Sequence, residues 1–137
     1  MKFMLLVYVD PDLVDALPEG EMDGMLRTCF DHVDELQRDG RLIESQMLES
    51  PRAARSVRIR NDRVTATDGP FSEAKEVLGG YWLLQVRSRD EALAWGSRVP
   101  LNDGEMIELR QVYEMTEFSD EAQALAAPVS DAMSRTP

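Results

Sequence analysis

The chain has 137 residues, 43% of them hydrophobic, which is enough apolar material for one domain with a single core. Its formal net charge of −11 excludes nucleic-acid phosphates and anionic membrane surfaces as expected partners. One cysteine excludes an intrachain disulfide, and one histidine excludes a multi-histidine metal site within the chain. We expect a cytoplasmic protein with no metal, no cofactor, no nucleic-acid partner and no membrane attachment.

The first predicted strand, Phe3 to Val9, is apolar without polar alternation and stops at Asp10-Pro11, too short to span a membrane. Successive side chains of a strand point to opposite faces of the sheet, so both faces of this strand need a cover. Helices on one side of a single sheet leave its second face wet. We therefore predict a homodimer in which a second subunit covers that face.

After a predicted loop over residues 10–20, residues 21–39 have the periodicity of an amphipathic helix that Gly40 ends. Its apolar stripe consists of Met22, Met25, Leu26, Cys29, Val33 and Leu36. The place of Cys29 within the stripe favours a small core residue over a nucleophile. His32 lies at the edge of the stripe, where it is either a candidate catalytic group or a boundary histidine bonded to a neighbouring acid such as Glu35.

A mixed strand over residues 41–49 precedes a hairpin signal, in which strands 56–60 and 63–67 flank the turn Asn61-Asp62. The predicted inner face of the hairpin consists of Val57, Ile59, Val64 and Ala66. Five arginines lie between Arg52 and Arg63 in this acidic chain. They either face solvent and pair with acids such as Asp34, Glu35 or Asp62, or they form a face for anions or an acidic partner.

The stretch from Thr67 to Val86 is the most distinctive part of the chain. A strand ends at Asp68, Gly69-Pro70 breaks the chain direction, and a helical turn is predicted from Ser72 to Gly79-Gly80. An apolar strand, Tyr81 to Val86, follows. Asp68 either accepts backbone hydrogen bonds that shape this corner, or acts as an acid or base in a cleft beside it.

The remaining elements are a helix over residues 89–99 with Ser88 as its N-cap, an edge strand over 105–115, and a short helix over 119–127 that Pro128 ends. A loose tail follows. Without the hairpin, the order is βαββαβ, a ferredoxin-like α+β fold whose central strands are the first and third. We assign residues 1–115 to this domain and 116–137 to a C-terminal extension.

The corner resembles the central motif of the DGPF-domain family of YCII-related proteins. Three segments carry this resemblance, namely Asp68 to Phe71, Glu73 to Glu76 and Gly79 to Tyr81. The resemblance covers roughly residues 1–115 and implies a ferredoxin-like fold and a dimeric α+β barrel-type assembly, without an established reaction. Some YCII-related proteins carry a helix histidine paired with an aspartate and proposed to be catalytic. That position falls on Cys29 here, not on His32, so the dyad does not carry over.

Three functions are open at this point. The first is an enzyme acting on a small organic molecule, with Asp68 and His32 as candidate catalytic groups and with ligand contacts from Gly69, Pro70, Phe71, Lys75 and Tyr81. The second is a non-catalytic small-ligand-binding or regulatory module, since genes of DGPF-type proteins often lie beside those for alternative sigma factors. The third is a structural dimer module. An Asp68 buried in a pocket would favour the enzyme, and an exposed Asp68 the binding module.

Overall fold

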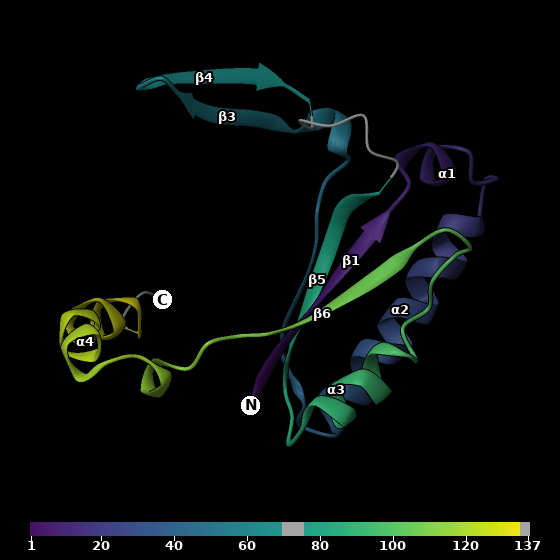
Figure 1. The fold of residues 1–137 in the computed structure, drawn as a ribbon. Helices are drawn as coiled ribbons and strands as arrows, with labels where there is room; N and C mark the ends of the chain where they lie inside the picture. The colour runs from purple at the N-terminus through teal and green to yellow at the C-terminus, as the bar shows by residue number, and fades with distance from the viewer. Residues whose placement is uncertain (70–75, 135–137) are drawn as a thin grey trace.

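The computed structural model describes residues 1–69 and 76–134. It shows an α+β fold in which a four-stranded antiparallel sheet carries helices on one face (Figure 1). The sheet strands are β1 (Lys2–Val9), β2 (Leu42–Met47), β5 (Val77–Gln85) and β6 (Met106–Gln111), and a separate hairpin pairs β3 (Arg55–Arg60) with β4 (Arg63–Asp68). The helices are α1 (Pro11–Asp15), α2 (Glu21–Arg38), α3 (Arg89–Gly96) and α4 (Asp120–Ser134).

The strand order in the sheet is β2-β5-β1-β6, and each neighbouring pair is antiparallel. β1 and β5 therefore occupy the centre, as their apolar residues on both faces predict. Each central strand is hydrogen-bonded on both sides, which leaves β2 and β6 as the edges. α2 and α3 lie on one side of this sheet, and β6 leads away to α4 on the other (Figure 1).

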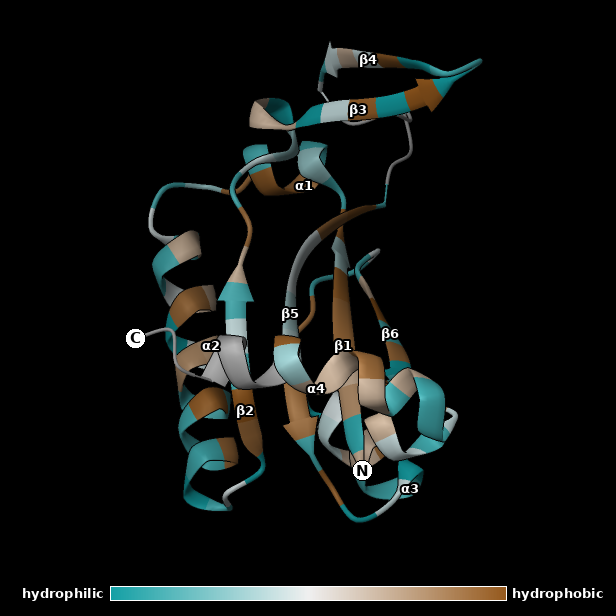
Figure 2. Cartoon of the chain, turned by 90° about the vertical axis from the view of Figure 1, so that its left-hand side faces the viewer, coloured by the Kyte–Doolittle hydropathy of each residue, from teal (hydrophilic) through white to brown (hydrophobic). Residues whose placement is uncertain are grey.

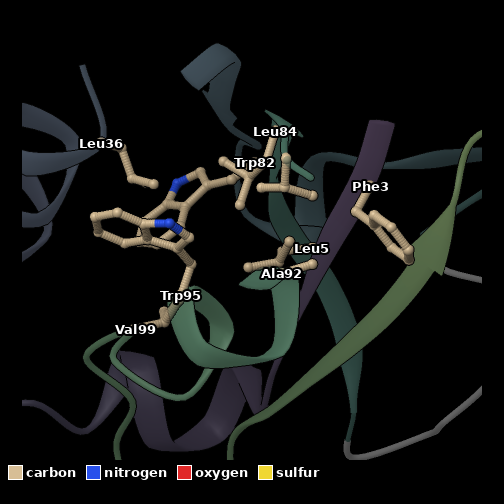
Figure 3. Close-up of a cluster of buried hydrophobic side chains, with 9 residues drawn as sticks. Phe3, Leu5, Leu36, Trp82, Leu84, Ala92, Trp95 and Val99 are labelled. Carbon is tan, nitrogen blue, oxygen red and sulfur yellow. The ribbon is translucent and has the colours of Figure 1, made fainter. Parts of the chain in front are cut away.

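The core fills the space between the sheet and its helices (Figure 3). Phe3 and Leu5 of β1 face Leu84 and Trp82 of β5 across the register, and all four side chains are buried. The helix side contributes Leu36, Ala92, Trp95 and Val99. Burying a large apolar side chain stabilises a fold by about 1.5–3 kcal/mol, so this cluster holds the helices on the sheet.

The opposite face of the sheet has an apolar centre that no helix of the described residues covers. Met4 and Leu6 of β1 pair with Leu83 and Tyr81 of β5, and all four residues are half-buried. Polar residues flank this centre on the edge strands, namely Glu44 and Gln46 on β2 and Glu108 and Arg110 on β6. We call this surface the open face.

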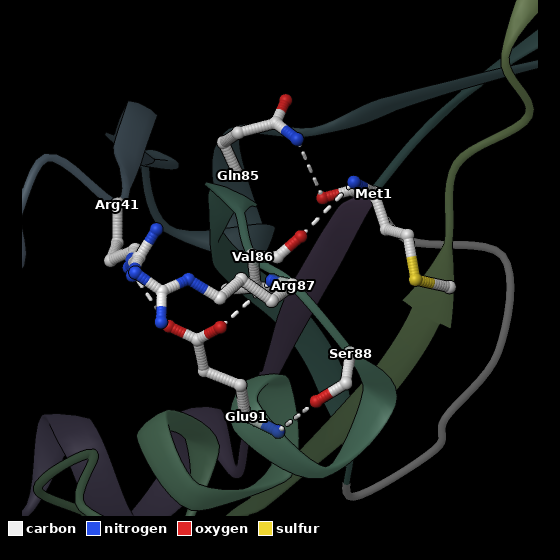
Figure 4. A network of polar contacts seen from close by, with 7 residues as sticks. All are labelled: Met1, Arg41, Gln85, Val86, Arg87, Ser88 and Glu91. Atoms are coloured by element: carbon white, nitrogen blue, oxygen red, sulfur yellow. Dashed lines mark hydrogen bonds and ion pairs between the residues drawn. The ribbon is translucent and has the colours of Figure 1, made fainter.

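A polar network joins the chain start to the first turn of α3 (Figure 4). The amino group of Met1 donates to the carbonyl of Val86 at 3.0 Å. Glu91 accepts a hydrogen bond from the backbone N–H of Arg87 at 2.8 Å and pairs with Arg41 at 2.8 Å. The hydroxyl of Ser88 accepts from the backbone N–H of Glu91, which confirms Ser88 as the N-cap.

The prediction of a helix ending at Gly79-Gly80 is wrong for the part of it that the structure describes. β5 begins at Val77, so both glycines are extended strand residues, while Pro70 to Lys75 lie outside the described residues. A Cβ on Gly80 would stand 2.7 Å from the carbonyl oxygen of Gln46. Glycine is required here because the β2 backbone approaches closely, and helix termination plays no part.

Two helices differ from the prediction. α1 lies inside the predicted loop, because the Asp10 carboxylate accepts from the Asp12 N–H at 2.9 Å and Pro11 suits the first helical turn. α4 continues through Pro128 to Ser134, which replaces part of the predicted tail. The alanines around Pro128 are the strongest helix formers and offset the hydrogen bond lost at the proline.

The face of the hairpin that was predicted to point inward lies in solvent. Val57, Ile59 and Val64 are 68%, 76% and 69% exposed. The hairpin of β3 and β4 shows hydrophobic segments in brown and stands clear of the sheet (Figure 2). The turn itself is confirmed, since Asn61 and Asp62 have φ values of 51° and 60°, as a type I′ turn requires.

Candidate functional site

A cavity of about 420 Å³ lies between α2 and the sheet, at the end of the sheet nearest α1. The strands contribute Val7 and Val9 of β1 and the glycines at the start of β5. The cavity extends to α1, to the segment after β2, and to the loop between α3 and β6. The cavity thus brings together five separate segments of the chain between Val7 and Glu105.

Most of the side chains that α2 presents to this cavity are apolar, and three of them contain a sulfur atom. Met22, Met25 and Cys29 line it together with Leu26, Phe30 and Val33. Methionine is flexible and polarisable, so such a wall adapts to ligands of different shape. Ligand pockets in proteins are typically about 300–1,000 Å³ and mainly apolar, with few polar groups, and this cavity has both properties.

One carboxylate in the cavity wall, that of Glu105, has a fixed orientation. It accepts hydrogen bonds from the backbone N–H of Asn102 at 3.0 Å and from its side-chain amide at 3.1 Å. The same amide lies 2.9 Å from the sulfur of Met25. Asp15 and Glu49 also line the cavity, and Asp15 pairs with Arg52 at 2.5 Å. An oriented carboxylate in a mainly apolar wall can recognise a hydrogen-bond donor on a ligand.

The thiol of Cys29 is half-buried in the same wall. Burial raises its pKa, and the negative charge of Glu105 raises the pKa further. A raised thiol pKa reduces the fraction of thiolate, which is the nucleophilic form. Cys29 therefore lines the cavity as a small apolar group, in agreement with its place on the helix stripe.

His32 lies behind the cavity wall, packed between two tryptophans. Its ring centroid is 4.8 Å from that of Trp82, which lines the cavity, and 5.8 Å from that of Trp95. The side chain is buried, and its Nε2 has no hydrogen-bond partner among the described residues. The prediction of a boundary histidine bonded to a neighbouring acid is wrong. His32 is buried, and Glu35 pairs with Arg98 instead.

The environment of His32 opposes its protonation. Burial lowers its pKa most, the positive charge of Arg98 lowers the pKa further, and the charge of Glu35 acts in the opposite direction. Arg98 itself stacks over Trp95 at 4.7 Å. The result is a neutral imidazole at neutral pH. His32 falls three residues after Cys29 and four before Leu36, and that spacing on the stripe is the signal for its burial.

Two predicted residues lie apart from the cavity. The side chain of Asp68 is 93% exposed and pairs with Arg55 at 3.3 Å at the end of the hairpin. Gly69, at a φ of 86°, donates its N–H to the carbonyl of Ala54 and closes the hairpin. An exposed Asp68 is the outcome that favours a binding module over an enzyme at the corner.

Tyr81 is a predicted ligand contact that is among the residues lining the cavity, although its side chain belongs to the open face. Desolvation raises its pKa, and a hydrogen bond to Glu44 and the charge of that residue raise the pKa further. Pro70, Phe71 and Lys75 lie outside the described residues. Arg52 and Arg55 pair with acids, as one of the two expectations for the arginines states, but their partners are Asp12, Asp15 and Asp68. Asp34 pairs with Arg38 instead.

The described ranges 1–69 and 76–134 contain no group of three or more His, Cys, Asp or Glu side chains placed to hold a metal ion. In the same ranges, every helix is too short or too polar to cross a membrane. The fold and the cavity together define a class: an α+β protein with a four-stranded antiparallel sheet and a ligand-sized apolar cavity under its first long helix.

Sequence comparison identifies the family of the chain. A YCII-related domain matches residues 1–116, and the chain belongs to the YCII-related family. It is also similar to an uncharacterised protein of Rhizobium meliloti (strain 1021), with 30% identity over 93 residues. That match covers 68% of this chain and 75% of the relative.

Proposed function

We propose that this protein binds a small, mainly apolar organic molecule in the cavity between α2 and the sheet. The observation that carries the proposal is the cavity itself, about 420 Å³ in volume and walled by the apolar stripe of α2. The oriented carboxylate of Glu105 supplies one polar contact, which favours a ligand with a hydrogen-bond donor. The exposure of Asp68 and the raised pKa of Cys29 support binding rather than catalysis.

We further propose that the chain is a DGPF-type member of its family with a ferredoxin-like unit, acting in the cytoplasm as a ligand-binding or regulatory module. The strand order β2-β5-β1-β6 and the motif from Asp68 to Tyr81 support this assignment. In this proposal a second subunit covers the open face, and the two sheets pack face to face. The half-buried Met4, Leu6 and Leu83 supply the apolar contact.

Filling the cavity from α2 should weaken ligand binding. The substitution Cys29→Phe places a ring in the space beside Met25, so the affinity for the neutral fluorescent dye N-phenylnaphthylamine should fall at least about tenfold. The dye is titrated and its emission recorded, with Trp82 in the wall as a second reporter. Thr28→Phe is the matched control, since Thr28 is exposed on α2 and does not line the cavity.

The control variant should bind the dye as the native chain does, and circular dichroism should show both variants folded. Equal dye affinity for the native chain and Cys29→Phe would place the dye elsewhere and contradict the proposal. A native chain that fails to bind the dye would count against an apolar site directly.

The dimer is expected to be the main species at micromolar concentration. Sedimentation equilibrium should give twice the chain mass of 15.5 kDa. Replacing Leu83 with arginine puts a charge into the centre of the open face and should yield monomers. Leu93→Arg is the control, because Leu93 is an exposed residue of α3 on the other side of the sheet. A native monomer over the whole range would refute this assembly, since the apolar open face would stay in water.

A further inference from the structure

Two segments project from the body of the chain on the side of the open face (Figure 1). The first is the β3–β4 hairpin, residues 55–68, which we call the hairpin arm. The second is α4, Asp120–Ser134, which we call the helix arm. Figure 2 shows the two arms at different heights in front of the sheet, with the hairpin arm beyond its upper end. Neither arm is part of the core cluster.

The hairpin arm carries an apolar face that is exposed among the described residues. Val57, Ile59 and Val64 share this face with Ala66, and the first three are at least 68% exposed. An isolated two-stranded hairpin is only marginally stable in water. A hairpin with a solvent-exposed apolar face therefore gains stability from a second surface packed on it.

The other face of the hairpin arm is basic. Arg60 and Arg63 stand directly opposite each other across the two strands, an arrangement that like charges make unfavourable. Neither arginine has an ion pair among the described residues. The arm holds four arginines and two aspartates, whereas the whole chain has a net charge of −11. A partner that supplies carboxylates would relieve this repulsion.

The helix arm complements the hairpin arm, because it carries an apolar stripe and acidic residues. An apolar stripe at helical spacing runs along it and consists of Ala122, Leu125, Ala126 and Val129. Leu125 is 75% exposed and Val129 59%. Asp120 and Glu121 in its first turn are exposed and have no ion pair among the described residues. The helix arm thus offers an apolar stripe and two carboxylates.

The two arms of one chain leave the sheet at opposite ends. The hairpin arm joins the end where Val9 pairs with Val77, and the chain departs for the helix arm near the end where Phe3 pairs with Gln111. β1 has eight residues, so these ends are about 25 Å apart. Contact between the arms is therefore far easier to achieve between two copies than within one chain.

We infer that the hairpin arm of one subunit packs on the helix arm of its partner, and that two such contacts clasp the dimer. This inference rests on the face-to-face dimer proposed above. A two-fold axis in the interface and perpendicular to the strands brings each hairpin arm to the partner's helix arm. An axis parallel to the strands would instead pair arginines with arginines and acids with acids, which is electrostatically unfavourable.

The clasp is tested by reversing the charges on each arm separately and then on both arms in one chain. Sedimentation equilibrium measures the dimer dissociation constant of each variant. Arg60→Glu with Arg63→Glu should weaken the dimer at least about tenfold. Asp120→Arg with Glu121→Arg should weaken it to a similar extent. All four substitutions together restore opposite charges across the contact and should return the dissociation constant to within about threefold of the native value.

The design separates the clasp from general charge repulsion between two acidic chains. The helix-arm variant makes the chain four charges more positive, so general repulsion alone predicts a tighter dimer, while the clasp predicts a weaker one. A tighter dimer, or failure of the combined variant to recover, would overturn the inference. If the native chain dimerises and none of the three variants alters its affinity, the clasp is wrong and the face-to-face dimer stands; a native monomer refutes both.

Discussion

Replacing Gly80 with alanine is expected to lower the free energy of unfolding by about 1–3 kcal/mol, the usual cost of forcing extra atoms into a packed site. The new methyl group would lie 2.7 Å from the carbonyl oxygen of Gln46 and 3.5 Å from the Cα of Met47. Both neighbours are backbone atoms of β2, so relief requires a shift of the strand itself. β2 also walls the cavity, so the variant should bind ligand less well.

A matched glycine elsewhere should respond in the opposite direction. Gly24 is inside α2, and a Cβ there would meet nothing within 4 Å. Gly24→Ala should therefore raise the free energy of unfolding by about 0.5–1 kcal/mol, the helix preference of alanine over glycine. Urea melts of both variants beside the native chain measure the difference. A Gly80→Ala variant as stable as the native chain would show that β2 can move away at little cost.

Gly79 and Gly80 also show where secondary structure cannot be predicted from neighbouring residues alone. A glycine pair after Glu73 to Val77 fits the end of a helix, because glycine commonly ends helices. The structure uses them for the approach of Val9 and of the β2 backbone, a contact between residues more than thirty positions apart. Nothing local in the sequence distinguishes these two reasons for glycine. The start of β5 could therefore not be predicted without the tertiary pairing.

Long apolar patterns, in contrast, gave the arrangement of the sheet. Apolar residues on both faces predicted that β1 and β5 are central, and the observed strand order has them there. The stripe of α2 predicted which of its side chains face the sheet, because helical periodicity depends only on the sequence. The cavity was not predictable in this way, since it depends on how far α2 stands from the strands.

The candidate site in the structure differs from the predicted one for a related reason. The residue types at the Asp68 corner are distinctive and predicted a site there, yet Asp68 ends a hairpin strand and lies in solvent. The cavity is built from common apolar residues such as Val7 and Met22, which carry no motif. Tyr81 belongs to the corner motif and is among the residues lining the cavity, although its side chain belongs to the open face.

His32→Phe is expected to raise the free energy of unfolding by about 1–3 kcal/mol, the usual penalty of a buried polar group without a partner. Phenylalanine keeps an aromatic ring between Trp82 and Trp95 and removes the unpaired Nε2. His32→Gln serves as the control, because it removes the titrating group but keeps a polar side chain at the site. The phenylalanine variant should be the more stable of the two.

The same substitution should change how stability depends on pH. The folded pKa of His32 is lowered, first by burial and then by Arg98, so the unfolded chain binds its proton more readily. Stability from this residue is complete above its unfolded pKa of about 6.5 and is lost as pH falls below that value toward the folded pKa.

His32 is the one histidine of the chain, so urea melts at pH 7.0 and pH 5.5 isolate its contribution from most carboxylates. The native chain should lose stability between these two pH values by more than either variant, and an equal loss in all three would show that His32 is not buried as a neutral ring.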